Sequence, residues 1–412
     1  MQIYLVGGAV RDQLLGRAIS DKDWVVVGAT PEQMLALGYQ QVGADFPVFL
    51  HPSTHQEYAL ARTERKNGQG YTGFACDASE TVTLEQDLRR RDLSVNAMAM
   101  DDKGEVIDPY HGQQDLADRV LRHVSEAFTE DPLRVLRVAR FAARFKAEGF
   151  TIADETLALM AQIASSGELE HLSAERVWKE TARSLMEAHP EVYFQTLHQC
   201  TALAQWFAEI DTLWAIDNTE LPHLSLEGHA PSLLVLQQAA RLSCPLTVRF
   251  AVLVYKLGKN QSKAAPWPAL GEQDTRGFVA INALCDRVKA PNDCRELALM
   301  MSGFHRHVER ASELQASELL NMFNRCDAWR KPQRFEDFLK ACVVEAQLRK
   351  HLETPCYLDS DYVLLALQTA QNVDVKAIVE AGYQGVQIKQ QLEQQRIGVL
   401  IRLKDQAANI NP

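Results

Sequence analysis

The sequence predicts an α+β fold, with a small mixed sheet in an N-terminal head and helices in the rest of the chain. Over roughly the first 110 residues, short runs of β-branched and aromatic residues alternate with helical stretches and turns. We expect four of these runs to be strands: Ile3–Val6, Trp24–Val27, Val48–Leu50 and Tyr58–Ala61. From about Asp131 onward, apolar residues recur with the 3.6-residue period of helices, so this part is predicted to be all-helical.

The length of 412 residues exceeds what one hydrophobic core usually organises, so several domains are expected. Polar and proline-containing breaks interrupt the helical part, among them Ser165-Ser166-Gly167, Asn218–Ser232, Ala264–Gly271 and Thr354-Pro355. We therefore predict four segments: a head at 1–140, a helical neck at 141–220, a helical body at 221–330 and a helical tail at 331–412.

The composition is that of an ordinary globular protein, with 46% hydrophobic and 24% charged residues. No apolar run approaches the ~18 residues that span a bilayer, and Gln2–Val6 lacks the regions of a signal peptide. We expect a cytoplasmic protein without a membrane partner. The net charge of −11 argues against indiscriminate binding to nucleic acid, so any such site must be local.

A glycine pair, Gly7-Gly8, lies between a predicted strand and a predicted helix. Bare backbone N–H groups at such a turn can approach a phosphate without obstruction by side chains. By itself the pair is more typical of an ordinary tight turn. Asp21 and Asp23 follow, directly before the apolar run Trp24–Val27.

Side chains two apart on a strand face the same way, so Asp21 and Asp23 could hold divalent ions side by side. Two such ions would stabilise the attacking and the leaving oxygen of a phosphoryl transfer. A lone Asp-x-Asp is more often a solvated acidic turn, but its closeness to the glycine pair favours the metal site.

Two arginine groups follow. Arg89-Arg90-Arg91 is either a solvated face or a set of bidentate phosphate ligands. Farther on, Asp131 and Pro132 are suited to the N-cap and first position of a helix. One arc of this helix carries four arginines, Arg134, Arg137, Arg140 and Arg144. They lack acidic partners at i,i+4 spacing, which argues against a merely solvated face.

Together these segments resemble the class II tRNA nucleotidyltransferases, the CCA-adding enzymes of the DNA polymerase β superfamily. The resemblance covers about the first 180 residues. Five motifs of that family are matched, and Ser94 stands where the family usually has threonine. They are Gly7 to Asp23, Arg90 to Ala97, Asp108-Pro109 with Gly112 and Asp115-Leu116, Glu130-Asp131 with Arg134, and Ser173 to Glu180.

The resemblance implies a polymerase-β-like nucleotidyltransferase head and a set of residue roles. Asp21 and Asp23 would be catalytic and bind Mg²⁺, and Asp131 and Arg134 would read the base in place of a nucleic-acid template. Other nucleotide-binding residues would be Gly8, Arg11, Arg91, Arg137 and Arg140, while Ser173 to Glu180 would brace the neck or be an ordinary capped surface helix. The partners would be tRNA, CTP and ATP, for a monomer or weak homodimer.

The segments Asp45–Pro52 and Thr63–Phe74 favour full CCA addition, the second being similar to a mobile loop that CC-only relatives shorten. Two alternatives stay open: a poly(A) or A-only polymerase, and a catalytically silent RNA-binding relative.

Beyond about residue 220 the resemblance implies an HD-type phosphohydrolase domain whose metal ligands are missing here. Its H-D-x-G-K signature falls on Tyr255 to Lys259, while Pro231, near His229, and Gln347 stand at the other ligand positions. The ammonium group of Lys256 has no lone pair for a metal. We expect the fold to be kept and the hydrolase activity to be lost, with His305 and His307 on a solvated helix face.

Overall fold

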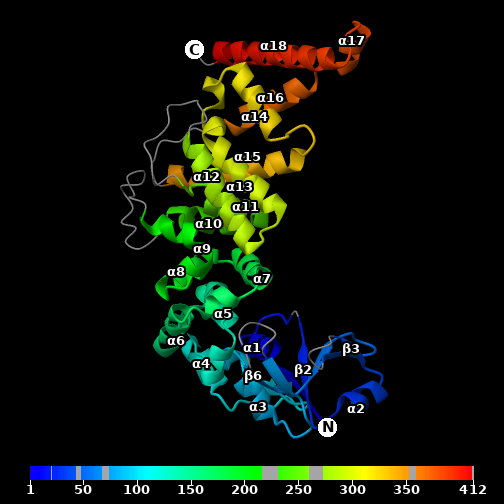
Figure 1. The fold of residues 1–412 in the computed structure, drawn as a ribbon, viewed down its shortest axis with the longest axis vertical. Helices are drawn as coiled ribbons and strands as arrows, with labels where there is room; N and C mark the ends of the chain where they lie inside the picture. Colours follow the sequence, from blue (N-terminus) through cyan, green and yellow to red (C-terminus); the bar gives the residue numbers. More distant parts are fainter. Residues whose placement is uncertain are drawn as a thin grey trace. The chain divides into compact units, whose positions relative to one another are not determined.

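The computed structural model divides into two compact units, Met1–Trp206 and Phe207–Pro412 (Figure 1). It describes residues 1–19, 21–42, 48–66, 74–215, 231–258, 272–351 and 359–410. The division into four segments remains a prediction. Several expectations lie wholly or partly outside the described residues: those on 45–47, 67–73, 218–230, 264–271, 354–355, His229 and Lys259.

The first unit contains a seven-stranded mixed sheet, which confirms the predicted head. The strand order is β3-β4-β5-β2-β1-β8-β9, and only β2 and β5 run parallel among neighbours. The strands are β1 Gln2–Val6, β2 Asp23–Val27, β3 Gln40–Val42, β4 Val48–Leu50, β5 Glu57–Leu60, β8 Ala99–Met100 and β9 Val106–Ile107.

The sequence predicts a loop over Thr63–Phe74, but both ends of this range belong to strands. β6 Thr63–Lys66 and β7 Phe74–Asp77 pair antiparallel, in register Thr63↔Asp77. A further parallel pair joins β10 Val120–Leu121 to β11 Thr151–Ile152.

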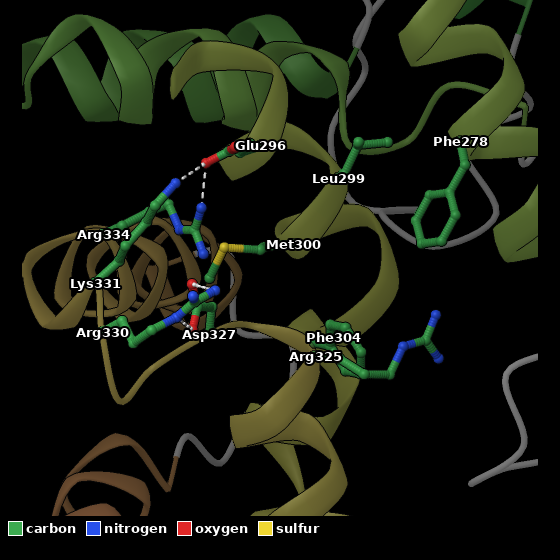
Figure 2. Close-up of a pocket in the computed structure, with 10 residues that line it drawn as sticks. All are labelled: Phe278, Glu296, Leu299, Met300, Phe304, Arg325, Asp327, Arg330, Lys331 and Arg334. Atoms are coloured by element: carbon green, nitrogen blue, oxygen red, sulfur yellow. Dashed lines mark hydrogen bonds and ion pairs between the residues drawn. The ribbon is translucent and has the colours of Figure 1, made fainter. Parts of the chain in front are cut away.

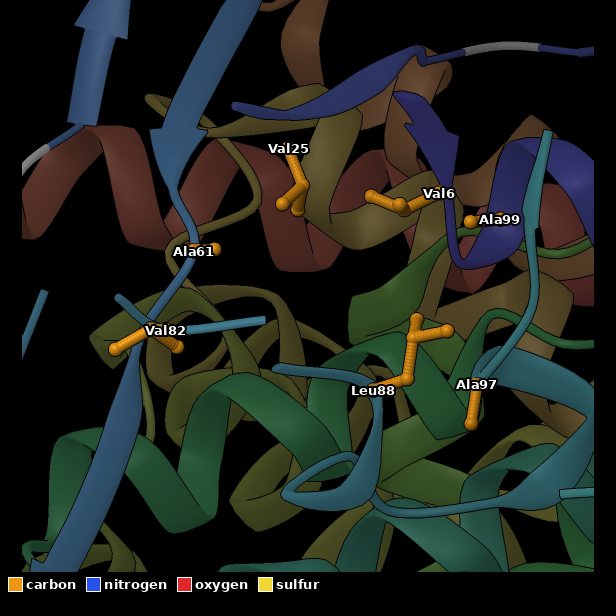
Figure 3. Packing of buried hydrophobic residues seen from close by; sticks show 7 residues of the cluster. All are labelled: Val6, Val25, Ala61, Val82, Leu88, Ala97 and Ala99. Atoms are coloured by element: carbon orange, nitrogen blue, oxygen red, sulfur yellow. The ribbon is translucent and has the colours of Figure 1, made fainter. Parts of the chain in front are cut away.

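Alternation along the central strands builds the core that supports the site. Val6 and Val25, on neighbouring strands, are buried against Leu88 of α3 and against Ala97 and Ala99 (Figure 3). The site therefore rests on an apolar layer that fixes the ends of β1 and β2.

The helices of the first unit lie between and after the strands. They are α1 Gly8–Leu14, α2 Pro31–Ala36, α3 Leu84–Arg89, α4 Gly112–Asp118, α5 Leu133–Phe145, α6 Asp154–Ser165, α7 Ala174–Leu185, α8 Pro190–Gln199 and the first part of α9 Leu203–Asp211. Two short 3₁₀ segments, Ser94–Asn96 and Glu126–Glu130, precede α5.

Helix α5 begins at Leu133, one residue later than the sequence predicts. Pro132 holds the N-cap position with φ −60° and ψ −19°, and these helical angles explain why proline is tolerated there. Asp131 nevertheless acts as a cap, because its Oδ1 accepts a hydrogen bond from the Leu133 N–H at 3.1 Å.

The described part of the second unit is helical, as predicted. Its helices are α10 Pro231–Arg241, α11 Leu246–Val254, α12 Glu272–Val288, α13 Asn292–Glu309, α14 Ala316–Arg325, α15 Pro332–His351, α16 Ser360–Gln371, α17 Val375–Glu380 and α18 Val386–Ile410. Across the described residues, no helix combines the length and apolar character needed to cross a bilayer.

Candidate active site

The glycine pair forms the predicted turn between β1 and α1. Gly7 has φ +69°, which L-residues rarely adopt, and a Cβ there would lie 2.8 Å from Arg91 Nη1. Only glycine allows the guanidinium of Arg91 this close to the backbone. The turn thus brings backbone N–H groups at the start of α1 and a cation together, which is the chemistry of a phosphate site.

Strand pairing brings Asp23 to this turn. In the β1–β2 register Val6, the residue before Gly7, is opposite Asp23. Partial desolvation raises the pKa of Asp23, the charge of Arg91 lowers it, and the charge of Asp21 raises it again. The two carboxylates and Arg91 therefore interact electrostatically at one corner of the sheet.

The prediction that both aspartates lie on one strand is wrong in detail. β2 begins at Asp23, and Asp21 precedes it in non-regular backbone. Strand alternation therefore orients Asp23 alone, and Asp21 reaches the same corner through the chain that leads into the strand.

The triple arginine divides into different environments. Arg89 is exposed, whereas Arg90 and Arg91 both pair with the fully buried Asp87 of α3, at 2.7 and 3.3 Å. Burial would raise the pKa of Asp87, but the charges of Arg90 and Arg91 outweigh it and lower that pKa. Asp87 was missed by the sequence analysis, although its i,i+3 and i,i+4 spacing to the two arginines is a usable signal.

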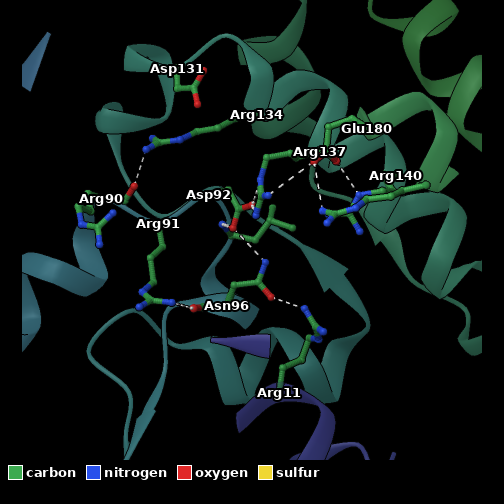
Figure 4. Close-up of polar contacts among 12 residues, drawn as sticks. Arg11, Arg90, Arg91, Asp92, Asn96, Asp131, Arg134, Arg137, Arg140 and Glu180 are labelled. Atoms are coloured by element: carbon green, nitrogen blue, oxygen red, sulfur yellow. Dashed lines mark hydrogen bonds and ion pairs between the residues drawn. The ribbon is translucent and has the colours of Figure 1, made fainter. Parts of the chain in front are cut away.

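A chain of buried polar groups links this turn to helix α5 (Figure 4). Asp92 Oδ2 accepts hydrogen bonds from Arg137, with Nε at 2.8 Å, and Asp92 Oδ1 accepts one from Asn96 Nδ2 at 3.0 Å. Asn96 Oδ1 in turn accepts from Arg11 Nη1, and Arg11 Nε donates to Asp12 at 2.9 Å. Arg11 is 3% exposed, so it holds α1 in place from within the unit.

The electrostatics of this chain follow from its charges. Burial alone would raise the pKa of Asp92, but the charge of Arg137 and the hydrogen bonds from Asn96 and Arg137 lower it far below its usual value. Asp92 reciprocally raises the pKa of Arg137. Both groups are therefore charged at neutral pH.

Three of the four arginines of α5, Arg137, Arg140 and Arg144, have acidic partners on other elements. Arg140 Nε donates to Glu180 of α7 at 2.6 Å, and Arg144 donates to Asp12 of α1 at 3.3 Å. Arg134 and Arg140 are each 7% exposed, so the arginine face of α5 is largely internal.

Asp131 and Arg134 lie together at the start of α5 but engage different partners. Asp131 Oδ2 accepts a hydrogen bond from Arg176 of α7 at 2.8 Å. Arg134 donates to the carbonyl oxygens of Arg90, at 2.6 Å, and Ala127. Arg176 thus connects the Ser173 to Glu180 motif to Asp131, as expected of a bracing element.

The residues at the corner of the sheet fit a divalent ion and a phosphate. Asp21 and Asp23 offer hard carboxylate oxygens, which Mg²⁺ accepts together with substrate phosphate oxygens. Arg91 adds a guanidinium whose side chain is 19% exposed, which can contact a phosphate oxygen at this corner. No group of three or more His, Cys, Asp or Glu side chains in the described ranges is arranged to hold a metal ion.

The second unit has ion pairs where the family resemblance expects metal ligands. Tyr255 is fully buried and donates to Glu345 Oε1 at 3.3 Å, while Arg349 pairs with both Glu345, at 2.9 Å, and Glu309, at 3.0 Å. The His305 ring packs edge-on to Tyr255 at 5.2 Å.

The prediction of a solvated face for His305 and His307 is wrong. His305 is half-buried, and His307 is buried in the helical core, where loss of solvent lowers its pKa to about 4.

Two family models match parts of the first unit and the start of the second. One, described as the poly A polymerase head domain, matches residues 3–122. The other, described as the probable RNA and SrmB-binding site of polymerase A, matches residues 149–213.

A multifunctional CCA protein from Pseudoalteromonas atlantica is 60% identical over 397 residues, covering 96% of this chain and 98% of that protein. Among solved structures, a CCA-adding enzyme with ATP has a TM-score of 0.62 at 20% identity and covers 97% of this chain and 86% of its own. The Bacillus stearothermophilus CCA-adding enzyme in complex with CTP has a TM-score of 0.57 at 24% identity, with coverages of 97% and 88%. At these identities the structural likeness concerns the fold.

The Asp92 chain leads to a stability prediction. We expect Asp92→Asn to destabilise the first unit at pH 7 by about 1.5–3 kcal/mol, the usual worth of a hydrogen bond to a charged group. The folded-state pKa of Asp92 is lowered, so its contribution is complete above the ordinary value of about 3.9 and declines as the pH falls below it. The measurement is denaturant unfolding at pH 7 and pH 3, with the exposed Asp102→Asn as control. The difference in unfolding free energy between wild type and Asp92→Asn should be smaller at pH 3 than at pH 7. Equal stability of Asp92→Asn and the control at pH 7 would contradict the role of Asp92.

Proposed function

Because the chain belongs to the family of the multifunctional CCA proteins, we propose that it adds or repairs the 3′-terminal CCA of tRNA. It uses CTP and ATP, needs no nucleic-acid template, and releases pyrophosphate. The reaction takes place in the first unit, and a cytoplasmic location is part of the proposal. The observation that carries the site assignment is the β1–β2 register, which joins Asp23 to the Gly7-Gly8 turn beside Arg91.

The mechanism assigns a different task to each part of the site. Asp21 and Asp23 bind the divalent ion, proposed to be Mg²⁺, which when bound neutralises phosphate charge and lowers the pKa of the attacking hydroxyl. The N–H groups at Gly8 and the guanidinium of Arg91 hold the triphosphate. The tRNA 3′ oxygen then forms a bond to the α-phosphorus as the bond to pyrophosphate breaks, with no covalent enzyme intermediate.

Base selection is assigned to the start of α5. Asp131 accepts hydrogen bonds and Arg134 donates them, so together they can match one edge of a base. Arg176 orients the Asp131 carboxylate, and the two carbonyl oxygens that bind Arg134 orient its guanidinium. The remaining cations, Arg137 and Arg140, are oriented by Asp92 and Glu180 and provide positive charge for the nucleotide. Arg11 supports the turn from beneath.

The alternatives from sequence have less support. A poly(A) or A-only polymerase would agree with the head-domain family, but the 60% identical relative that matches almost the whole chain is named a CCA protein. A silent RNA-binding relative is disfavoured because the aspartate pair, the glycine turn and Arg91 are all present and interacting.

We predict that Asp21→Ala and Asp23→Ala each lower nucleotide addition by more than about 100-fold, because a metal ligand is lost. The fold should persist, since neither side chain belongs to the core. The assay is extension of tRNA ending before C, C or A, with each nucleoside triphosphate alone and in combination. Asp102→Ala, an exposed carboxylate of the same unit, is the matched control. Turnover like that of the wild type in either aspartate variant would exclude the metal assignment.

We predict that Asp131→Ala and Arg134→Ala relax base selection by at least about tenfold, because a polar site discriminates only while its groups are paired. The measurement is incorporation of UTP and GTP relative to CTP and ATP. Arg183→Ala is the control, since Arg183 is an exposed arginine of α7 that is 3.9 Å from Glu180. Thermal unfolding of Arg134→Ala separates lost selectivity from lost folding, and unchanged ratios in folded protein count against the base-reading role.

We further predict that the second unit does not hydrolyse 2′,3′-cyclic AMP or 2′-AMP with added Ni²⁺ or Mg²⁺, while tRNA is still extended. Tyr255 and Lys256 stand where a histidine and an aspartate would have to coordinate metal, and the nearby Glu345 is already paired with Arg349. Release of phosphate or of the ring-opened product is measured on the full chain. Metal-stimulated hydrolysis that persists in Asp23→Ala would show a working second site.

A further inference from the structure

A pocket of about 440 Å³ opens among α12, α13 and the start of α15 in the second unit (Figure 2). Its volume is within the range of about 300–1,000 Å³ typical of small-ligand sites. Neither Tyr255 nor His305 is among the residues that line it, so it differs from the position expected to bind metal. It also lies outside the unit to which nucleotidyl transfer is assigned.

One side of the pocket is apolar and aromatic. Phe278 of α12 joins Leu299, Met300 and Phe304 of α13 there. Phe278 packs closely on Gly303, where an added Cβ would lie 2.9 Å from its ring. The aromatic rings offer a flat surface to a planar ring, and the flexible, polarizable thioether of Met300 can adapt to it.

The opposite side is basic. Figure 2 shows Lys331 and Arg334 across Met300 from Phe278, with Arg330 beside them. The side chains of Arg330 and Lys331 are 82% and 51% exposed, so they can reach a ligand at the rim. A fourth cation, Arg325, lies on the apolar side, with its guanidinium 5.4 Å from the centre of the Phe304 ring (Figure 2).

The cations outnumber the carboxylates at this site. Glu296 pairs with both Lys331, at 3.0 Å, and Arg334, while Asp327 pairs with Arg330 at 2.8 Å. Three cations and two carboxylates leave the basic side at +1, and Arg325 brings the whole pocket to +2 in a protein whose net charge is −11.

Hydrogen bonds hold Arg334 in position at the pocket wall. Its Nη2 donates to the Cys326 carbonyl at 2.7 Å and its Nη1 to Glu296. Its Nε is buried and has no hydrogen-bond partner among the described residues. The guanidinium is thus preoriented, and its side chain is 17% exposed at the pocket wall, so it is suited to contact a phosphate oxygen.

We propose that this pocket binds a nucleotide unit, with the phosphate at Arg330, Lys331 and Arg334 and the base against Phe278 and Phe304. Stacking on an aromatic side chain and ion pairing with the phosphate together match this one class of ligand. The shared chemistry allows two sources, a free nucleotide or one nucleotide of an RNA strand. The proposal is independent of the assignment of CCA addition, because its residues all lie in the second unit.

The experiment uses the full chain and two probes. Calorimetric titration with AMP tests a free nucleotide, and fluorescence anisotropy with a labelled six-nucleotide oligoadenylate tests an RNA strand. The variants are the double substitution Arg330→Gln/Lys331→Gln, which removes exposed charge, and Phe278→Leu, which keeps apolar volume without the aromatic face. The matched control is Arg310→Gln. Arg310 resembles Arg330 because it too is an exposed arginine that forms an ion pair at i,i+3 spacing, in its case with Glu313.

We expect the double variant to lose about tenfold in affinity for one of the probes and Phe278→Leu to lose about fivefold, with Arg310→Gln unchanged. Loss with AMP identifies a free-nucleotide site, and loss with the oligonucleotide alone identifies an RNA contact. Any binding of AMP in the first unit is the same in the wild type and in all variants, so it does not contribute to the difference in affinity between them. Equal affinities of wild type and both variants for both probes, an equal loss in the control, or no binding by the wild type would overturn the proposal.

Discussion

The candidate active site depends on one buried carboxylate. Taking a charged aspartate out of water costs several kcal/mol unless cations and donors surround it. Asp92 meets this requirement with Arg137 from α5 and Asn96 from the preceding 3₁₀ turn, and Asn96 in turn accepts from Arg11 of α1. The ion pair of Asp92 with Arg137 therefore forms only when α5 packs on residues 92–96, and the bond from Arg11 to Asn96 adds α1 to this assembly, next to the glycine turn and Asp23.

The same principle organises the charges around the substrate position. Asp12, Asp87 and Glu180 each neutralise arginines that would otherwise repel one another inside the unit. The carboxylates fix the cations in direction but neutralise only part of their charge, since Asp12 and Asp87 each pair with two arginines. The remaining positive potential favours a triphosphate, which carries several negative charges. A protein with a net charge of −11 can in this way keep a strongly basic site confined to one place.

Local signals in the sequence were sufficient for much of this arrangement, and long-range ones were not. The glycine turn, the strands at Trp24 and Val48 and helix α5 follow from residues adjacent in the chain, and all are present. The start of β2 after Asp21, the strands β6 and β7 and the burial of His307 depend on tertiary pairing, which periodicity does not report. The α5 arginines illustrate this limit. The sequence shows that their own helix offers no acidic partners, but only the three-dimensional structure identifies Asp92 and Glu180 as the partners.

Charge compensation also explains how the second unit can keep a helical core at the position where its family resemblance expects a metal. A buried carboxylate such as Glu345 needs a cation, and a bound metal ion is one way to provide it. Here Arg349, one helical turn away on α15, pairs with Glu345 and with Glu309 of α13, and Tyr255 donates a further hydrogen bond. The guanidinium joins α13 to α15 and compensates the charge of both carboxylates. These ion pairs balance the charge of the buried carboxylates with groups of the chain itself, so the charge balance of this part of the core does not depend on a bound ion.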